Sequence, residues 1–364
     1  MFKIKKQINL LYITNLLSNL SITGAWVAIL AARGFSLVEI GFAETVFHIT
    51  SLIFEIPSGL LADIYGRKKM LLVSQMMAII GNLIMVFSNG IGLVCFSFVF
   101  HALGYNFASG SGDALAYDSL KSVHEEKRYE KYASNQMIIY RIGSAVSTLC
   151  AGTALLMGYK LAYILSVVTH VIVLFITMGL VEVRLEEKKE TEKKHILVAL
   201  VNYFKESILF FKNNGKATKL MFANSLVGAF DILLLFFLQA KLMEAGISNI
   251  WLGVALFVME LGGIIGAKLI VRVKKARYAS IFCICTMGVL FGIFLEHSGM
   301  VPIMVIGGVI SAMADDALQI RTDAKLQDMF PSEQRATLIS IASFTFSVIM
   351  IVLSPLAGYF FSIW

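Results

Sequence analysis

Uncharged apolar stretches of about 20 residues or more recur along this chain, and they exclude most folds. At 1.5 Å per residue, a helix of that length crosses the hydrocarbon core of a bilayer, which is about 30 Å thick. Lipid cannot hydrogen-bond to backbone N–H and C=O groups, so a spanning segment must be a helix or a strand of a closed barrel. Barrel strands alternate apolar and polar residues over about 10 positions, and these stretches do not alternate. The sequence therefore predicts an all-α membrane protein.

Eleven spans are expected. The composition agrees, because 58% of the 364 residues are hydrophobic and 15% are charged, whereas a soluble domain is about 45–50% apolar. The chain ends soon after the eleventh span without a polar tail, so we expect a twelfth span to be missing. The expected spans are residues 8–32, 36–61, 70–88, 91–120, 133–157, 160–182, 218–243, 247–271, 279–297, 301–327 and 336–361.

The placement of lysine and arginine predicts the orientation. With the N-terminus inside, all 31 Lys and Arg residues except Arg33, Lys160, Lys241 and Arg141 fall in inside segments, which leaves 27 there. Cytoplasmic loops carry such an excess, so we expect a cytoplasmic N-terminus in a multi-pass protein of the plasma membrane. The net charge of +7 is then the charge of the cytoplasmic face and gives no reason to expect nucleic acid as a partner.

One long polar stretch divides six spans from the rest. We therefore expect an N-terminal bundle at residues 1–182, a cytoplasmic linker at 183–217 and a C-terminal bundle at 218–364. Apolar residues at helical spacing between Ile196 and Phe211 fit a helix that lies on the membrane surface. A solvated connector fits that segment equally well.

Similar segments follow one another in the same order in both halves of the chain. GDALAYDSL at residues 112–120 matches DDALQIRTD at 315–323, and each half carries a glutamate followed about four helical turns later by a basic pair. Each match is weak alone, but their shared order indicates a duplicated helical bundle.

The segment EIPSGLLADIYGRKK, residues 55–69, interrupts the apolar pattern between the second and third spans. Gly59 allows a neighbouring helix to approach closely, and Gly66 permits a turn with positive φ. Asp63 can meet the positive end of a helix dipole, and Arg67 can bind a carboxylate through two hydrogen bonds. Such a cluster can latch helices together at one end of a bundle.

The pattern Gly59-x-x-x-Asp63-x-x-Gly66-Arg67-Lys68 resembles the signature of the major facilitator superfamily. The resemblance covers essentially the whole chain and implies two six-helix bundles related by a pseudo-two-fold axis. In that family the signature is thought to hold the outward-open state, and we expect Asp118 to be the partner of Arg67. The second half has GAKLIVRVKK at the corresponding place, with no acid at the Asp position, as expected if the latch is made once. The alternative is that GRKK only marks the cytoplasmic side.

Charged side chains at bilayer depth carry the hypotheses on coupling. Each costs about 2.5–3.5 kcal/mol or more and needs a partner, a proton or water. Asp231 and Glu260 have no obvious basic neighbour at their depth, so we expect them to carry a coupling proton, because a carboxyl in a low-dielectric site can hold a proton at neutral pH. Asp113 and Arg141 lie on adjacent spans and are expected to form an ion pair, which can also be purely structural. Further pathway candidates are Glu44, His48, Asp315 and Asp316.

The favoured function is secondary active transport by alternating access, with proton-coupled export of small amphipathic or drug-like molecules, as in bacterial multidrug-efflux antiporters. The Phe-rich seventh span, with Phe230, Phe236 and Phe237, would suit such substrates if it faces the pathway. Two alternatives stay open. A proton symporter that imports a metabolite would show polar and basic groups facing the cavity, and a membrane scaffold or sensor would need no buried unpaired acids.

The expected partners are a small-molecule substrate, protons and the lipid bilayer, and the chain is expected to be a monomer. No nucleophile–base spacing indicates an enzyme, and the four cysteines lie in apolar runs without the spacing of metal ligands. We therefore expect no cofactor and no metal.

Overall fold

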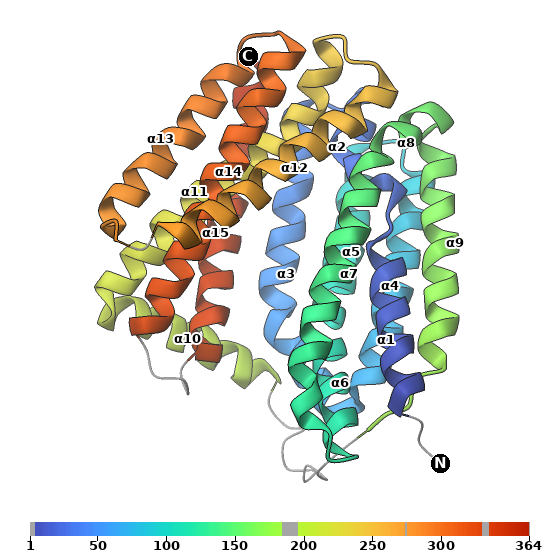
Figure 1. The fold of residues 1–364 in the computed structure, drawn as a ribbon. Helices are drawn as coiled ribbons and strands as arrows, with labels where there is room; N and C mark the ends of the chain where they lie inside the picture. The colour runs from blue at the N-terminus through green and yellow to red at the C-terminus, as the bar shows by residue number, and fades with distance from the viewer. Residues whose placement is uncertain (1–3, 184–195, 274, 330–334, 364) are drawn as a thin grey trace. The chain divides into compact units, whose positions relative to one another are not determined.

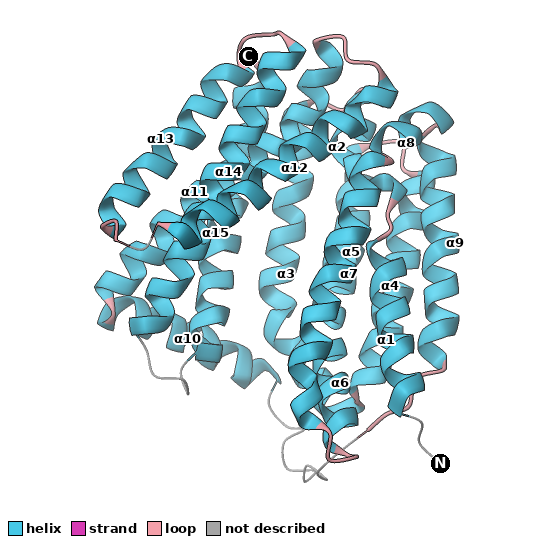
Figure 2. Cartoon of the chain, viewed as in Figure 1, coloured by secondary structure: helices cyan, strands magenta, loops and turns pink. Residues whose placement is uncertain are grey.

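The computed structural model describes residues 4–183, 196–273, 275–329 and 335–363. Within these ranges the chain is helical and contains no strand (Figure 2). In the first half the helices are α1 (Ile4–Asn19), α2 (Trp26–Ala32), α3 (Leu37–Tyr65), α4 (Arg67–Phe87), α5 (Ile91–Ala108), α6 (Ser111–Lys121), α7 (Tyr129–Leu149), α8 (Ala151–Met157) and α9 (Tyr159–Met178). They are followed by α10 (Ile196–Asn213), α11 (Gly215–Glu244), α12 (Asn249–Arg272), α13 (Tyr278–Glu296), α14 (Val301–Met329) and α15 (Arg335–Ser362) (Figure 1).

The number of spans agrees with the sequence prediction. Ten helical stretches in the described ranges are long and apolar enough to cross a membrane. An eleventh is obtained when the pair Glu126–Leu149 and Ala151–Met157, bent by 42°, is taken as one span. The expected all-α fold with eleven spans is therefore confirmed. α10 occupies part of the segment expected to link the two bundles.

The fourth span is broken at one glycine. Gly110 has φ +70°, a conformation that costs glycine little and other residues much. The chain therefore ends α5 at Ala108 and starts α6 at Ser111. The change of chain direction at Gly110 orients the first turn of α6, which carries Asp113.

The helices group into two compact units. Unit 1 comprises Met1–Gly24, Ile49–Cys150 and Met157–Phe204. In it α4 packs along α5 and α9, and α1 packs along α7 and α9. Ser74 Oγ on α4 donates to the Gly104 carbonyl on α5 at 2.7 Å, and Ser97 Oγ on α5 donates to the Gly81 carbonyl on α4 at 2.8 Å. Such small residues let helices approach closely without a hydrophobic driving force between them.

Unit 2 comprises Ala25–His48, Ala151–Leu156 and Lys205–Trp364. α14 packs along both α12 and α13, and α11 packs along α15. Gly262 and Gly266 of α12 lie against the backbone of α14. A Cβ atom at these glycines would lie 2.2 Å from the Val309 carbonyl oxygen and 2.0 Å from that of Met313. The two glycines, four residues apart, thus make the close contact between α12 and α14 possible.

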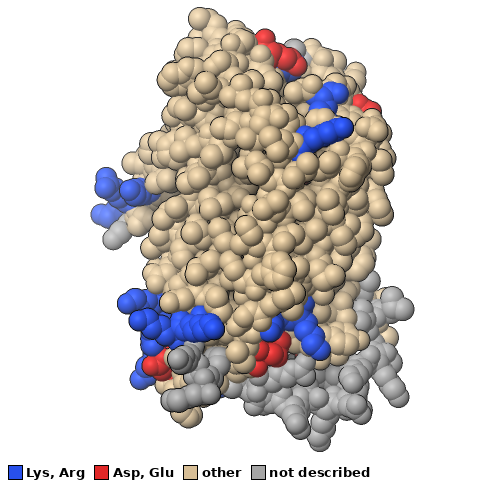
Figure 3. Space-filling view, turned by 90° about the vertical axis from the view of Figure 1, so that its right-hand side faces the viewer, with Lys and Arg blue, Asp and Glu red and all other residues tan. Residues whose placement is uncertain are grey.

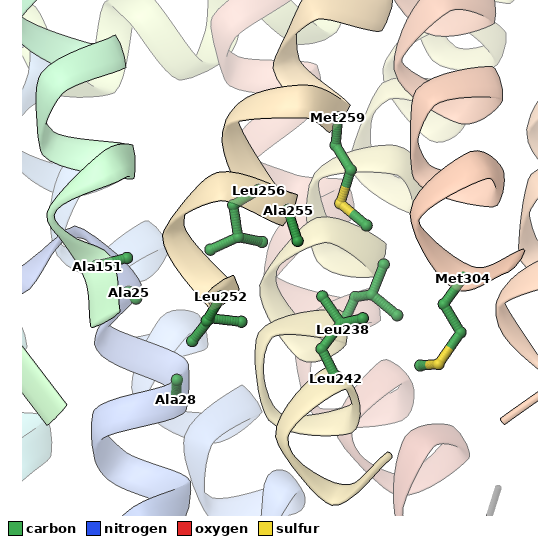
Figure 4. Close-up of a cluster of buried hydrophobic side chains, with 10 residues drawn as sticks. All are labelled: Ala25, Ala28, Ala151, Leu238, Leu242, Leu252, Ala255, Leu256, Met259 and Met304. Carbon is green, nitrogen blue, oxygen red and sulfur yellow. The ribbon is translucent and has the colours of Figure 1, made fainter. Parts of the chain in front are cut away.

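Three segments from the first half of the chain belong to unit 2: α2, the beginning of α3, and α8. Ala25, Ala28 and Ala151 form one hydrophobic cluster with residues of α11, α12 and α14 (Figure 4). The backbones also touch. A Cβ at Gly152 would lie 1.6 Å from the Asn249 carbonyl oxygen, and one at Gly41 would lie 2.3 Å from that of Ser354. These segments are therefore held against the second half with no room for an added side chain.

The surface of the helices is apolar. Phe175 and Phe294, for example, are 66% and 72% exposed. Figure 3 shows one face with a broad uncharged middle and charged side chains toward its margins. Apolar surface of this extent needs a cover, and the lipid expected from the span lengths supplies it.

Substituting Gly152 with alanine tests the tight contact between α8 and α12. The added methyl group must displace the Asn249 backbone, and we expect Gly152→Ala to lower the stability of the purified protein by about 1–3 kcal/mol, as overpacking typically does. Thermal unfolding in detergent measures the change. Gly92→Ala on α5 is the matched control, because nothing lies within 4 Å of its added Cβ. Equal melting temperatures for wild type and Gly152→Ala would contradict the contact.

Candidate functional site

Unit 1 contains a cavity of about 720 Å³. It is lined by residues of α1, α4, α5, α6, α7 and α9, including Asn15, Asn19, Gln75, Gln136, His101 and His170. A cavity of this size fits a small organic molecule, since ligand pockets typically measure about 300–1,000 Å³. Its lining combines these polar side chains with apolar ones such as Leu11, Leu71 and Met137.

A row of side-chain amides forms one wall of this cavity. Asn19 Nδ2 donates to Asn15 Oδ1 at 2.7 Å, and Asn15 Nδ2 donates to Gln136 Oε1 at 2.5 Å. Gln136 in turn donates to the hydroxyl of Tyr132. An amide offers two donors and two acceptor lone pairs, so the row keeps capacity for a hydrogen-bonding solute.

Two histidines on α5 and α9 also line the cavity. Nδ1 of His170 lies 2.8 Å from Gln75 Oε1. Because that oxygen can only accept, His170 donates from Nδ1, and in the neutral ring Nε2 is the acceptor. His101 packs against Gly81, with Nε2 3.2 Å from the position that a Cβ would occupy there. The sequence gave no sign that Gln75 would orient His170.

Asp113 and Arg141 both line the cavity, but they do not form the expected ion pair. Within the described part of the chain neither side chain makes a hydrogen bond or salt bridge, and both residues are exposed. The prediction used only the depth of each residue along its span. Depth does not fix the direction in which a side chain leaves its helix, and the αL turn at Gly110 reorients the start of α6.

The signature residues form a cluster at the start of α4. Arg67 makes an ion pair with Asp118 on α6, and its Nη1 also donates to the Ala114 carbonyl at 2.7 Å. Asp63 lies 4.0 Å from the Arg67 guanidinium, one helical turn earlier. The expected contact between Arg67 and Asp118 is thus present. Gly66 has the expected positive φ, +106°.

Glu182 is a member of this cluster that the sequence did not indicate. Its two carboxylate oxygens accept the backbone N–H groups of Arg67 and Lys68 at 3.1 and 2.9 Å. Gly66, at the N-cap position, has no side chain to do this. A carboxylate here satisfies two free N–H groups and meets the positive end of the helix dipole. Lys68 Nζ donates to the Met178 carbonyl at the end of α9, at 2.8 Å. The start of α4 is therefore bonded both to Glu182 and to the end of α9.

Gly59 differs from expectation. No atom of the described residues lies within 4 Å of the position that its Cβ would take. The close helix approach predicted there is therefore absent. The reason is that the small-residue contacts of unit 1 are made on α4 and α5 instead.

Buried acids collect in unit 2. Asp231 on α11 and Asp315 on α14 are each 4% exposed, and Oδ1 of each has no hydrogen-bond partner among the described residues. Gln319 donates to Asp315 Oδ2 at 3.0 Å. Asp316 reaches the backbone of α12, where a Cβ at Gly263 would lie 2.2 Å from its Oδ2. Within the ranges described, no three metal-ligating side chains gather in a group that could hold a metal ion.

Glu296, at the end of α13, was missed by sequence reasoning. It is fully buried, and neither carboxylate oxygen has a hydrogen-bond partner among the described residues. It packs beside Gly307 of α14. The residue lies inside the expected span 279–297, but its depth near the end of that span gave no reason to expect burial.

Glu260 differs in the opposite direction. We expected a buried acid near the middle of a span, and the residue is exposed on α12. As with Asp113, its depth was predictable, whereas its direction about the helix axis was not. Glu44 and His48 lie one turn apart on α3 with His48 Nε2 3.3 Å from Glu44 Oε1, and both are buried.

Removing the charge of Glu182 tests its role at the start of α4. We expect Glu182→Gln to lower stability by about 1 kcal/mol, because an amide keeps only one acceptor oxygen and no charge for the helix dipole. The melting temperature in detergent measures this. Glu130→Gln, an exposed acid on α7, is the control and is expected to change nothing. A Glu182→Gln protein as stable as wild type would show that the cap is dispensable.

Comparison with known proteins identifies the family. The family model of the Major Facilitator Superfamily matches residues 8–320. An uncharacterised MFS-type transporter of Bacillus subtilis (strain 168), YxaM, is 23% identical over 332 residues, which are 87% of this chain and 79% of that protein. Crystal structures of transporters superimpose on the fold. A mutant form of the nucleoside transporter NupG has a TM-score of 0.78 at 13% identity, covering 97% of this chain and 91% of that one.

A bacterial homologue of the human lysosomal transporter Spinster, in an inward-facing and unoccupied conformation, has a TM-score of 0.74 at 15% identity, covering 97% of this chain and 80% of that one. At such identities the structures support the fold alone, and the family model extends the resemblance from the short signature to most of the sequence. The chain belongs to the Major Facilitator Superfamily of membrane transporters.

Proposed function

We propose that this protein is a proton-coupled secondary active transporter of a small polar solute, working by alternating access. The observation that supports this most strongly is the cavity of unit 1, which lies within a membrane-spanning bundle and is lined by amides, histidines and two unpaired charges. Some of these side chains also join helices, as Asn15 of α1 does with Gln136 of α7. Asp113 and Arg141 make no such bond among the described residues and stay open to the cavity. Such a lining suits the reversible binding of a hydrogen-bonding molecule.

The distribution of lysine and arginine favours a protein of the plasma membrane with its N-terminus in the cytoplasm. The signature cluster then lies at the cytoplasmic end of unit 1, together with Lys68, Lys121 and Arg128. The alternating contacts of a transporter need one end closed while the other is open. We assign the closure of the opposite end to the packing of α2 and α8 on α11 and α12 in unit 2.

The solute class follows from what lines the cavity and what does not. Two of the three phenylalanines that suggested a drug-like substrate pack within unit 2, whereas Phe230 is 45% exposed. Phe237 is 1% exposed and stacks on Phe361 at 5.4 Å, and Phe236 makes an edge contact with Trp26. Polar and basic groups facing the cavity are the feature expected of a metabolite transporter. We therefore favour a polar metabolite as the solute.

Export of an amphipathic molecule is the second candidate. Met137, Tyr105 and Tyr140 line the same cavity and are 58%, 62% and 45% exposed. These side chains can cover an apolar or aromatic part of a solute. The two candidates differ in which compounds move and in which direction.

Proton coupling is assigned to Asp231 and Asp315. Both carboxyls are buried without a basic partner among the described residues, and each has one oxygen without a hydrogen-bond partner. A charged carboxylate without a partner is costly in the interior of a membrane protein, so Asp231 and Asp315 are expected to hold protons when they are shielded from water. Glu260 is a weaker candidate than it was from sequence, because it is exposed.

Reconstituted protein tests transport and coupling together. In proteoliposomes containing a pH-sensitive dye, we screen nucleosides, sugars, amino acids and amphipathic cations for solute-driven proton movement. At least one polar compound is expected to give it. Asp231→Asn and Asp315→Asn are each expected to abolish proton movement while preserving solute exchange. Asp323→Asn, an exposed acid on the same helix as Asp315, is the control. Wild-type proton movement in both buried-site variants would refute the coupling assignment.

The signature cluster is proposed to act as the cytoplasmic latch. Arg67→Ala removes the guanidinium that contacts Asp118, Asp63 and the Ala114 carbonyl. We expect transport to slow by about tenfold or more with solute binding retained, because loss of one partner from a half-buried pair costs of the order of 1.4 kcal/mol or more. Transport at the wild-type rate in this variant would remove the latch from the mechanism.

A further inference from the structure

Two opposite charges in the cavity of unit 1 have no partner among the residues that the structure describes. Asp113 lies in the first turn of α6 and Arg141 beyond the middle of α7, and both line the cavity. No hydrogen bond or salt bridge to either side chain occurs within the described residues. Arg67, at the start of α4, has a carboxylate partner in Asp118. Unit 1 thus pairs one arginine with an acid of its own, whereas Arg141 is left without one among the described residues.

An unpaired charge inside a membrane bundle needs a physical reason. Placing one at the centre of a bilayer costs about 2.5–3.5 kcal/mol or more, and water in a cavity or a bound counter-ion reduces that cost. Two opposite charges in one cavity would gain further by meeting. That they remain apart, each facing the same space, indicates that both are available to a molecule that enters it.

Contacts between α6 and α7 place the two charges at different levels. Asp113 precedes Tyr117 by four residues on α6, and Tyr117 meets Tyr129 at the start of α7 with ring centroids 5.4 Å apart. Asp113 therefore lies near the first turns of α7, whereas Arg141 is twelve residues beyond Tyr129, about 18 Å along the helix. Gln136 and Asn15, hydrogen-bonded to each other at 2.5 Å, lie on the wall between these levels. The cavity therefore presents a negative end, an amide middle and a positive end.

We propose that the solute of this cavity is dipolar: a small molecule with a cationic group that pairs with Asp113 and an anionic group that pairs with Arg141. This inference rests on the proposed transport function and narrows its solute class. The planar guanidinium of Arg141 matches a carboxylate through two parallel hydrogen bonds. The amides between the charges bind polar atoms in the middle of the solute. A solute with a single charge pairs with either Asp113 or Arg141 and leaves the charge of the other residue uncompensated.

A homologous series of ω-amino carboxylic acids tests this with the full-length protein in lipid nanodiscs. Each member carries one ammonium and one carboxylate group, and the chain length sets their separation. Alkylamines and alkyl carboxylic acids of the same lengths are the singly charged comparisons. We expect affinity, measured by isothermal titration calorimetry, to pass through a maximum with length, and the best member to bind at least about tenfold more tightly than either comparison, as one additional close charge pair provides.

Two variants, each of which removes one charge, test which group of the solute pairs with Asp113 and which pairs with Arg141. Asp113→Asn is expected to weaken the best ω-amino acid at least about tenfold and to leave the alkyl carboxylic acid unaffected or tighter, since it removes only the negative end. Arg141→Gln is expected to do the reverse with the alkylamine. Glu130→Gln, on the exposed surface of α7, is expected to bind every probe like wild type.

Three results would overturn the proposal: singly charged probes that bind as tightly as the dipolar ones, variants that weaken all probes equally, or no binding by any member of the series. None of these would affect the transport function itself, which the proteoliposome screen tests with other solutes. Failure of that screen for every solute, with ω-amino acid binding intact, would instead leave a dipolar binding site in a protein that does not couple it to protons.

Discussion

The need to satisfy every polar group without help from lipid governs this structure. It makes the spans helical, because a helix bonds its own backbone, and it decides where charged side chains can lie. In unit 1 the Arg67 guanidinium is met by Asp118 and a backbone carbonyl, and the N–H groups at the start of α4 are met by Glu182. Some groups are not satisfied in this way within the described residues, and we propose that a solute or a proton satisfies them: Asp113, Arg141, Asp231, Asp315 and Glu296.

Helix packing follows from the same constraint. Lipid tails are as apolar as leucine, so helices associate through close fit and small residues. Gly262 and Gly266 bring α12 onto α14, and Gly152 brings α8 onto the start of α12. Through such contacts unit 2 holds α2, α8 and the beginning of α3, although these precede the linker in sequence. Packing of segments from the first half of the sequence on the second half suits a transporter, since contacts between the two sequence halves must form and separate in each cycle.

The sequence predicted what is encoded locally. Each of the eleven spans carries its own length of apolar residues, and Gly66 carries its positive φ. Arg67 and Asp118 could be matched because both lie at the same end of their spans. Glu182 could not be found, since it meets Arg67 from 115 residues away. For Asp113, Arg141 and Glu260 the depth was correct and the direction was not, because apolar spans without a strong polar face do not define their rotation. The packing of α8 on α12 depends on the tertiary fold alone.

Glu182 also connects parts of the chain that are distant in sequence. It lies four residues beyond the end of α9, and its carboxylate accepts hydrogen bonds from the backbone of the two residues that follow Gly66. A displacement of Glu182 would therefore be transmitted directly to the first turn of α4, which also carries the Arg67 guanidinium. The end of α9 and the start of α4 are thus expected to move together.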